Sequence, residues 1–430
     1  MKRDPSRNVV EQWVILLTFV VMYIGLAWTA VAGEEAAPPP GEDGADWPMW
    51  GHDPGHTFAS PDKTLKPPYR EIWKWKEIDC DRGGYSGLAG HDVLGYVVYR
   101  GAVYVFDQRS RIVALDTKDG RMLWRSAEPV VTDFSLAAGQ GLVLAVGQES
   151  GKGGALQGFD AATGTPRWKF LPAPEEGFRE EMPQTEGMVP AHPVVAHGLC
   201  YLVGRNKTVF AVKLTDGSLK WKHPVEEGKI WSVPALEGEN LYFVARSDDK
   251  HELCCLSAKD GRLLWKTPVD LSLNHWVPIG LACSEGNVYL AGSSGSEKHP
   301  PRLLCCRASD GKTVWAKVLR PSEKVYGLAI GDGRLFCGGM ILDAKTGQSK
   351  AEAPWLVEEI WMPLDFCVYF NGYFQLKPVP AHKILLDGKT AQSVPMDLKE
   401  HDQVVGFGPV AGGQGYVTTF KSYVVAVGPR

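Results

Sequence analysis

The sequence predicts an all-β protein, an eight-bladed β-propeller in which the N-terminal strand completes the C-terminal blade. A phrase made of an apolar strand, an Asp-x-x-x-Gly turn and a tryptophan recurs along the chain. A second strand-like phrase precedes each copy, and the fourth strand that the last copy lacks is found near the N-terminus. The 48 glycines and 30 prolines agree with many short strands joined by turns.

The first phrase defines the repeating unit of the sequence. Its clear copies are "IVALDTKDGRMLW" (112–124), "LQGFDAATGTPRW" (156–168), "VFAVKLTDGSLKW" (209–221), "LCCLSAKDGRLLW" (253–265) and "LLCCRASDGKTVW" (303–315). Weaker copies follow at 340–351 and 383–394, and a truncated copy at 424–428. The glycine supplies a positive φ for a tight turn, and the side chain four residues before it can cap that turn.

One tryptophan and one glycine per unit are therefore predicted to be structural residues of the repeat. We expect the indole rings to be mostly buried between neighbouring units, where a bulky ring fills the space that adjacent sheets leave. The residues are Trp73, Trp124, Trp168, Trp221, Trp265 and Trp315, with Gly120, Gly164, Gly217, Gly261 and Gly311.

The second phrase supplies the preceding strand of each unit. It reads "GAVYVFD" (101–107), "GLVLAVG" (141–147), "GLCYLVG" (198–204), "ENLYFVA" (239–245), "GNVYLAG" (286–292) and "GRLFCGG" (333–339), with looser copies at 365–371 and 413–419. A further short apolar strand lies ahead of each copy. Four strands in about 45 residues are typical of a propeller rather than of a sandwich or a solenoid.

Closure of the ring is predicted from both ends of the chain. The last unit ends with its third strand, "YVVAVGPR", whereas "REIWKWK" (70–76) is an isolated fourth strand with Trp73 in the repeat position. We therefore expect residues 71–76 to pair with residues 422–428, which leaves no exposed sheet edge at that seam. The preceding stretch "DWPMWGHDPGHTFASP" (46–61) is interpreted as a cap that leads into the closing strand.

That cap contains His52, Asp53 and His56, which are potential metal ligands. Three such residues in a loop are common by chance, and side chains of this kind often bond to their own loop backbone. We predict no metal here and a structural role for the three side chains.

The N-terminus resembles a targeting segment. Lys2, Arg3 and Arg7 precede an uncharged apolar run from Val14 to Ala32, which is long enough to span a bilayer and ends in Ala-Val-Ala. Residues 1–32 are predicted to be a signal peptide or an N-terminal membrane anchor, and both alternatives remain open. Either places the body outside the cytoplasm, in the periplasm or anchored to the inner membrane. Residues 33–45 are predicted to be a disordered linker and 46–430 the propeller.

The net charge and the cysteine positions exclude some classes of function and of cross-link. The net charge of −4 gives no basic face for nucleic acid. The nine cysteines include two adjacent pairs, Cys254-Cys255 and Cys305-Cys306, both inside the third-strand phrase. Neighbours on a strand point to opposite faces and cannot bond to each other. We interpret them as small core residues and expect no structural disulfide.

These phrases resemble the pyrroloquinoline-quinone-like (PQQ-like) propeller repeat family. The resemblance covers nearly all of 46–430 and rests on the A-L-D-x-x-x-G-x-x-x-W phrase, the "GLCYLVG"-type strands and the "DWPMWGHDPGHT" stretch. The family includes quinoprotein dehydrogenases and also non-catalytic scaffolds, such as the BamB subunit of the outer-membrane β-barrel assembly machine. The resemblance implies that dehydrogenase members hold the quinone and Ca²⁺ in the funnel of the ring, some against a vicinal disulfide.

The motifs of this sequence favour a non-catalytic scaffold over a quinoprotein dehydrogenase. The chain has no Cys-x-x-Cys-His for haem and no His-Glu-x-x-His for zinc, so no catalytic residue or metal ligand is predicted and any cofactor-binding residue is unknown. We expect no cofactor, because PQQ with Ca²⁺ is not supported by these residues. The predicted function is an exported, non-catalytic propeller that binds a protein or cell-envelope partner. The alternative is a PQQ-dependent periplasmic oxidoreductase.

The binding face is predicted from topology. The Asp-x-x-x-Gly turns lie on one face, whereas the longer segments are assigned to the other: 77–92, 169–188, 246–251, 293–301 and 371–381. Long loops on a rigid scaffold tend to carry function. The candidate partner-binding residues are Glu175, Glu176, Arg179, Glu180 and Glu181, an acidic group suited to steering a basic surface. The alternative is that these loops are neutral insertions.

Overall fold

The computed structural model describes residues from Asp46 to Arg430 with internal gaps. The gaps are 77–95, 108, 131, 148–153, 174–175, 177–191, 205–206, 249, 272–279, 293–299, 320–327, 338, 353–366, 377–383, 391, 393–403 and 420–422. The predicted signal or anchor segment and the linker, residues 1–45, lie outside the described residues. In the described part no helix is both long and apolar enough to cross a membrane.

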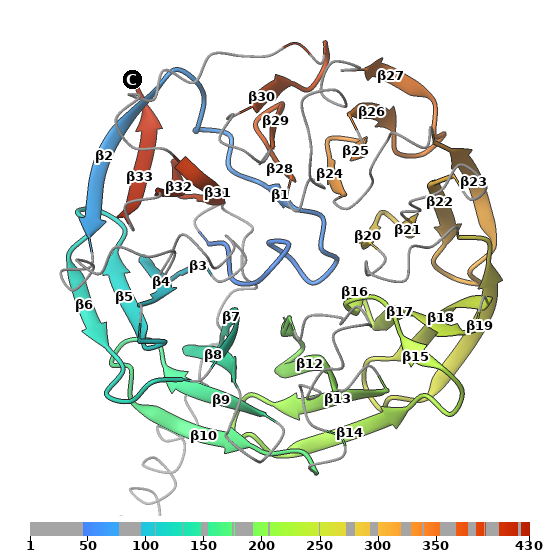
Figure 1. Cartoon of the computed structure of the whole chain (residues 1–430), viewed down its shortest axis with the longest axis horizontal. Helices are drawn as coiled ribbons and strands as arrows, with labels where there is room; N and C mark the ends of the chain where they lie inside the picture. The colour runs from blue at the N-terminus through green and yellow to red at the C-terminus, as the bar shows by residue number, and fades with distance from the viewer. Residues whose placement is uncertain are drawn as a thin grey trace, which may run out of the picture. The chain divides into compact units, whose positions relative to one another are not determined.

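Every named element in the described residues is a β-strand, and the strands form eight sheets that surround a common centre (Figure 1). The first sheet consists of β3 (Val97–Tyr99), β4 (Ala102–Phe106), β5 (Ile112–Asp116) and β6 (Met122–Arg125). The second consists of β7 (Thr132–Gly139), β8 (Leu142–Gly147), β9 (Ala155–Asp160) and β10 (Pro166–Phe170). The third consists of β11 (Val194–Ala196), β12 (Leu199–Gly204), β13 (Thr208–Lys213) and β14 (Leu219–Pro224).

The next three sheets repeat this order. The fourth has β15 (Lys229–Ile230) and β16 (Ala235–Glu237), both paired with β17 (Asn240–Ser247), then β18 (Lys250–Ser257) and β19 (Leu263–Val269). The fifth has β20 (Gly280–Ser284), β21 (Asn287–Gly292), β22 (Arg302–Arg307) and β23 (Thr313–Val318). The sixth has β24 (Ala329–Gly331), β25 (Arg334–Cys337), β26 (Met340–Asp343) and β27 (Ser349–Glu352).

The last two sheets take strands from both ends of the chain. The seventh has β28 (Cys367–Phe370), β29 (Tyr373–Leu376) and β30 (Ile384–Asp387), with β1 (Ala59–Ser60) added in parallel to β28. The eighth has β31 (Val404–Ala411), β32 (Gln414–Thr419) and β33 (Tyr423–Pro429), with β2 (Tyr69–Lys76) as its outer strand. In that pairing Trp73 lies opposite Ala426, so the expected pairing of 71–76 with the C-terminal strand is present.

Two kinds of turn join the strands. First and second strands are joined by two-residue hairpins such as Arg100-Gly101 and His197-Gly198, in which both residues have positive φ, as the twist of a tight hairpin requires. Third and fourth strands are joined by the Asp-x-x-x-Gly turn. Gly120 N donates to Asp116 O at 2.9 Å, and Lys118 N donates to the Asp116 carboxylate at 2.9 Å. The predicted capping of this turn is therefore present.

Each repeat tryptophan contacts the neighbouring sheet. A Cβ added to Gly261 in the fourth sheet would lie 2.5 Å from the ring of Trp221 in the third. The Trp221 indole N–H donates to Ala258 O at 3.0 Å, in the same turn. The same indole-to-turn hydrogen bond is made by Trp73, Trp124, Trp168 and Trp315. The expectation of mostly buried rings is correct for Trp73 and Trp221, but the other four are half-buried because the fourth strand is the outer edge of its sheet.

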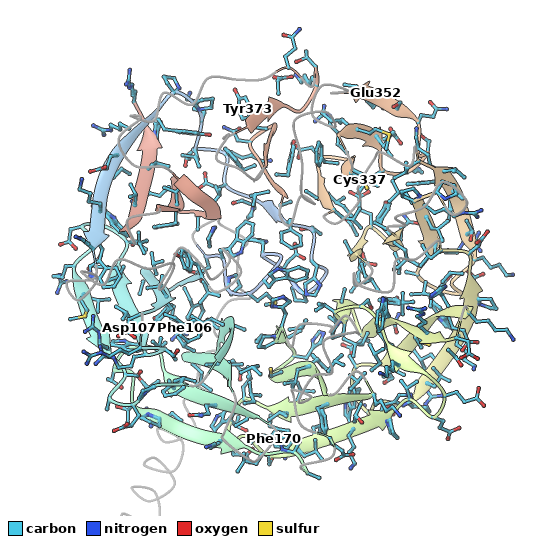
Figure 2. All side chains as sticks on the ribbon, in the orientation of Figure 1. Phe106, Asp107, Phe170, Cys337, Glu352 and Tyr373 are labelled. Atoms are coloured by element: carbon cyan, nitrogen blue, oxygen red, sulfur yellow. The ribbon has the colours of Figure 1, made fainter. Side chains whose placement is uncertain are left out.

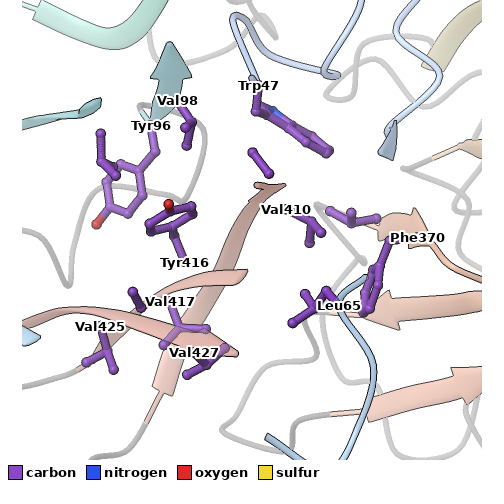
Figure 3. Packing of buried hydrophobic residues seen from close by; sticks show 14 of the residues in the cluster. Trp47, Leu65, Tyr96, Val98, Phe370, Val410, Tyr416, Val417, Val425 and Val427 are labelled. Atoms are coloured by element: carbon purple, nitrogen blue, oxygen red, sulfur yellow. The ribbon is translucent and has the colours of Figure 1, made fainter. Parts of the chain in front are cut away.

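Buried side chains join each sheet to the next. One cluster spans the first and second sheets, and further clusters connect the second to the fourth, the fourth to the fifth and the fifth to the sixth. Another cluster continues from the sixth sheet through the eighth to the first, and Figure 3 shows Trp47, Tyr96, Phe370 and Tyr416 within it. The core is therefore shared between neighbouring sheets, and no sheet has a core of its own.

The described cysteines are core residues. Cys200, Cys254, Cys255, Cys283, Cys305, Cys306 and Cys337 are free and buried. Cys337 lies within the sixth sheet (Figure 2). Cys254 packs in the cluster of the third and fourth sheets, and Cys255 in that of the fourth and fifth, so the two thiols point to opposite faces as expected. Burial raises the pKa of Cys255 to about 12. Cys80 lies outside the described residues, as does the side chain of Cys367.

Two segments differ from the sequence-based assignment. Residues 246–251 are not a long loop, because Ser247 pairs with Lys250 in a two-residue hairpin. Residues 371–381 were assigned to the loop face, yet Asn371-Gly372 is the first-to-second hairpin of the seventh sheet and 373–376 is its second strand. The phrase at 365–371 is accordingly the first strand of that sheet. The sequence is ambiguous there because both strands are short and apolar.

The contact between Trp221 and Gly261 gives a stability prediction. We expect Trp221→Ala to lower the free energy of unfolding by about 3–5 kcal/mol, because a large ring leaves a cavity between two sheets. We expect Gly261→Ala also to destabilise, through the ring and through its φ of 72°. Urea unfolding of both single variants and the double variant measures the coupling. Fully additive losses would contradict the contact.

Candidate functional site

The segment 46–62 lies in the middle of the protein, between the eight sheets (Figure 1). It hydrogen-bonds to the first strands in order around the centre. Val98 N donates to Trp47 O at 2.9 Å, and Ala138 N donates to Pro48 O at 2.6 Å. The other acceptors are Pro54 O for Leu236 N, Gly55 O for Cys283 N, Thr57 O for Ile330 N and Phe58 O for Tyr369 N, at 2.7–2.8 Å.

The third and eighth sheets are reached by side chains. Trp50 stacks on His192, which precedes β11, with ring centroids 4.5 Å apart and an interplanar angle of 4°. The Ser60 hydroxyl donates to Val410 O at 2.7 Å in β31. The segment therefore contacts all eight sheets and is more than the cap that the sequence predicts. We call it the central segment.

Local sequence explains how the central segment turns so often. Gly51, His52, His56 and Phe58 all have positive φ, and such turns favour glycine and short polar residues. Gly55 approaches the fifth sheet so closely that a Cβ there would lie 2.5 Å from Cys283 O. The Asp53 carboxylate accepts hydrogen bonds from Thr57 N at 3.2 Å and from the Thr57 hydroxyl. At the far end, the buried Asp62 carboxylate accepts from Thr64 N at 2.7 Å and from Gly413 N.

The histidines of the central segment are buried among aromatic rings. His52 is 6% exposed and His56 is 1% exposed. His56 packs edge-on against Trp50 at 4.7 Å, and His52 against Trp47 at 4.9 Å. Burial lowers the pKa of His56 to about 4, although Asp53 acts in the opposite direction. Burial, with the charge of His56, lowers the pKa of His192 to about 3. Both rings are therefore neutral at pH 7.

The ring nitrogens of His52 and His56 lack the hydrogen bonds to loop backbone that the sequence predicts. Both ring nitrogens of His52 and His56, and the indole nitrogen of Trp50, are buried without a hydrogen-bond partner in the described part of the chain. His52 Nδ1 lies 3.5 Å from Asp53 Oδ2, without hydrogen-bond geometry. The expectation that all three polar side chains bond to loop backbone is correct for Asp53 and wrong for the two histidines, because their rings point into the aromatic cluster.

The described residues provide no group that matches the quinone and Ca²⁺ site implied by the family resemblance. Within the described ranges, no group of three or more His, Cys, Asp or Glu side chains is placed to hold a metal ion. The adjacent cysteines are free thiols on opposite faces of their strands. The middle of the protein, where the family resemblance implies the quinone, is instead crossed by the chain's own central segment.

The predicted partner-binding residues are only partly described. Glu176 accepts two hydrogen bonds from Lys222 Nζ in β14, at 2.7 and 2.9 Å. Glu175, Arg179, Glu180 and Glu181 lie outside the described residues, as do most of the segments 77–92 and 293–301. The ion pair joins Glu176 to the outer strand of the third sheet.

The central contacts of 46–62 were not predicted from the sequence. The stretch is unusually dense in Gly, Pro and Trp, and that density was the only available signal. Its hydrogen bonds are made by backbone atoms, and backbone atoms are the same whatever the side chain. Pattern alone therefore does not specify their partners.

The sequence of this chain is similar to those of known proteins. A family model described as outer membrane protein assembly factor BamB matches residues 70–230 and 205–354. A protein of that same name from Yersinia pestis is 24% identical over 233 residues, which make up 50% of this chain and 50% of the relative. The chain therefore spans about half the length of the curated relative it matches.

Solved structures agree with a β-propeller fold. BamB from Moraxella catarrhalis aligns with a TM-score of 0.55 and 14% identity over 84% of this chain and 97% of that one. A quinohemoprotein alcohol dehydrogenase from Comamonas testosteroni aligns with a TM-score of 0.63 and 13% identity over 89% and 80% of the two chains. At such identities the likeness concerns the fold, and it does not distinguish scaffold from enzyme.

The central segment gives a prediction about folding. Deleting residues 46–76 should lower the melting temperature or cause aggregation, because buried N–H groups of the first strands lose their acceptors and the last sheet loses its outer strand. Thermal unfolding with light scattering measures this. A synthetic peptide of residues 46–76, added to the truncated protein, should restore part of the loss. A truncated protein that melts with the full-length chain would refute the role.

His56 gives a pH prediction. Its folded-state pKa lies below the ordinary value of 6.5, so the unfolded chain binds more protons between pH 6.5 and 4. Stability should therefore fall as the pH falls through this window, by about 3 kcal/mol from His56 alone. Asn tolerates positive φ and does not titrate, so His56→Asn should be less stable at pH 7 but should lose less between pH 7 and 4. Urea unfolding at both pH values tests this, and an unchanged pH dependence would contradict it.

Proposed function

Because the chain belongs to the family of the outer membrane protein assembly factor BamB, we propose that it is an exported, non-catalytic β-propeller that binds a protein or another component of the cell envelope. The observation that carries this proposal is the central segment. It ties the first strands together where a catalytic propeller needs space for its cofactor. A rigid centre and variable loops suit a docking scaffold.

We propose further that the eight sheets are the eight blades of one closed ring. The pairing of β2 with β33 is the closing contact, and the shared buried clusters support it. First strands of successive sheets contact one another, including β31 with β3, β3 with β7, and β28 with β31. A closed ring needs no additional partner to cover an open sheet edge.

The partner is proposed to dock on the face opposite the Asp-x-x-x-Gly turns. The central segment bonds to Leu236, Cys283 and Ile330, each two residues before a first-to-second hairpin, and these hairpins share the face of the turns. The segment thus obstructs the centre at that end. Loops at the other end, including the acidic residues around Glu176, remain the surface for a basic partner. Export through residues 1–32, cleaved or retained, belongs to the same proposal.

A PQQ-dependent oxidoreductase is the second candidate. It is favoured by the fold likeness to a quinohemoprotein alcohol dehydrogenase. The residues that would hold the quinone and its metal are not present as a group in the described chain, and we assign no residue to such a reaction.

Charge reversal tests the docking face. Glu175→Lys, Glu176→Lys, Glu180→Lys and Glu181→Lys together should slow association with an envelope partner identified by crosslinking, because electrostatic steering acts mainly on association rates. Four matched reversals among acids of the turn face, at the exposed Asp119, Asp216 and Asp260 and the half-buried Asp310, should leave the rate unchanged in surface plasmon resonance. Equal effects of both sets, or none of either, would refute the assignment. Dye reduction that requires PQQ and Ca²⁺ would instead support the oxidoreductase.

A further inference from the structure

A cavity of about 350 Å³ opens between the third and fourth sheets on the turn face. It is lined by Lys213 and Lys220 of the third sheet and by Lys259 and Glu239 of the fourth, with the side chain of Tyr201 among its walls. The volume lies at the small end of the range of ligand pockets. Three lysines against one glutamate leave a local charge of about +2 at neutral pH.

The position of Lys213 varies in charge along the repeat, with Ser257 in the fourth unit and Arg307, which bonds to Asp310, in the fifth. Lys213 occupies the position of Asp116, Asp160, Asp343 and Asp387, whose carboxylates accept hydrogen bonds from their turn backbone. Lys220 occupies the position just before the repeat tryptophan, which is Arg167 in the second unit and Lys350 in the sixth.

In those two other units the same pair of positions forms an ion pair. Arg167 lies 2.6 Å from Asp160, and Lys350 lies 3.3 Å from Asp343. In the third unit both positions carry lysine, so a salt bridge of the repeat is replaced by two like charges on adjacent strands. Like charges on paired strands repel each other, although Lys213 and Lys220 are not directly opposite in the register. In the third unit a different carboxylate caps the turn, because Ser218 N donates a hydrogen bond to Asp216 at 2.9 Å.

Two of the three lysines interact electrostatically with acids of the turns, Lys213 with Asp216 and Lys259 with Asp260, without forming a salt bridge. Among the described residues, Lys213, Lys220 and Lys259 form no ion pair, although lysines elsewhere on the outer strands do, such as Lys222 with Glu176 and Lys266 with Glu252. Tyr201 does not supply the missing interaction, because its hydroxyl donates to Ala258 O at 3.2 Å. Positive charge therefore predominates among the residues that line the cavity.

We propose that this cavity binds a small polyvalent oxyanion, carboxylate or phosphate, held between Lys213, Lys220 and Lys259. An anion between the ammonium groups replaces the repulsion by charge-assisted hydrogen bonds. Glu239, which also lines the cavity, disfavours a large polyanion. The site lies on the face opposite the proposed partner-docking loops, so it is independent of that function.

Calorimetry with inorganic pyrophosphate and with citrate, at matched ionic strength, tests the site in the full chain. One of the two should bind saturably with one-to-one stoichiometry, and the one that binds identifies phosphate or carboxylate as the preferred group. Lys213→Asp restores the ion pair of the second and sixth units. It should weaken binding about tenfold or more, while the melting temperature stays equal or rises slightly.

Lys345→Asp is the matched control, because it changes the charge equally at an exposed turn of the sixth sheet. It should leave the affinity unchanged. Lys220→Gln is an exposed replacement that does not disturb packing, and it should weaken binding even if Lys213→Asp folds poorly. Equal weakening by Lys345→Asp, unchanged affinity in both Lys213→Asp and Lys220→Gln, or no saturation below about 10 mM of either anion would overturn the proposal.

Discussion

The contact of each repeat tryptophan with the glycine turn of the next sheet is the constraint on which the rest of the fold depends. A four-stranded sheet buries too little surface to be stable alone, so its faces must be covered by neighbours. The indole covers the turn and donates to a carbonyl there, as Trp124 does to Ala161. Only glycine permits that approach, since a Cβ at Gly217 would lie 2.6 Å from Trp168. The same contact therefore sets the spacing between one sheet and the next.

The tryptophan contacts involve the outer strands, so the backbone groups of the innermost strands still need hydrogen-bond partners. First strands have a free edge that faces the centre, and buried backbone groups need partners. The central segment supplies them through backbone acceptors such as Pro54 O and Thr57 O. It does so with a chain that turns repeatedly through positive φ values. The middle of the described protein is therefore crossed by the chain itself, which is the observation behind the proposed function.

The two surfaces that we propose for recognition differ in chemistry. One carries the loops around Glu176, where an acidic group is fixed by Lys222. The other carries the uniform turns, in which the replacement of an aspartate by Lys213 creates a basic cavity. A repeat that conserves its turn geometry while its charges vary places different binding properties on one scaffold. Function in such a fold is set by side chains at equivalent positions.

The repeat, most of its strands and turns, and the strand that pairs with the C-terminal strand were predictable from the sequence, because periodic apolar residues, glycine and tryptophan act locally or on the next unit. Pairing of Trp73 with the C-terminal strand followed from counting strands. Only the tertiary structure decided the path of 46–62, the unsatisfied nitrogens of His52 and His56, and the hairpins at 246–251 and 371–372. Those features depend on backbone hydrogen bonds and burial between segments far apart in the chain, which no side-chain pattern encodes.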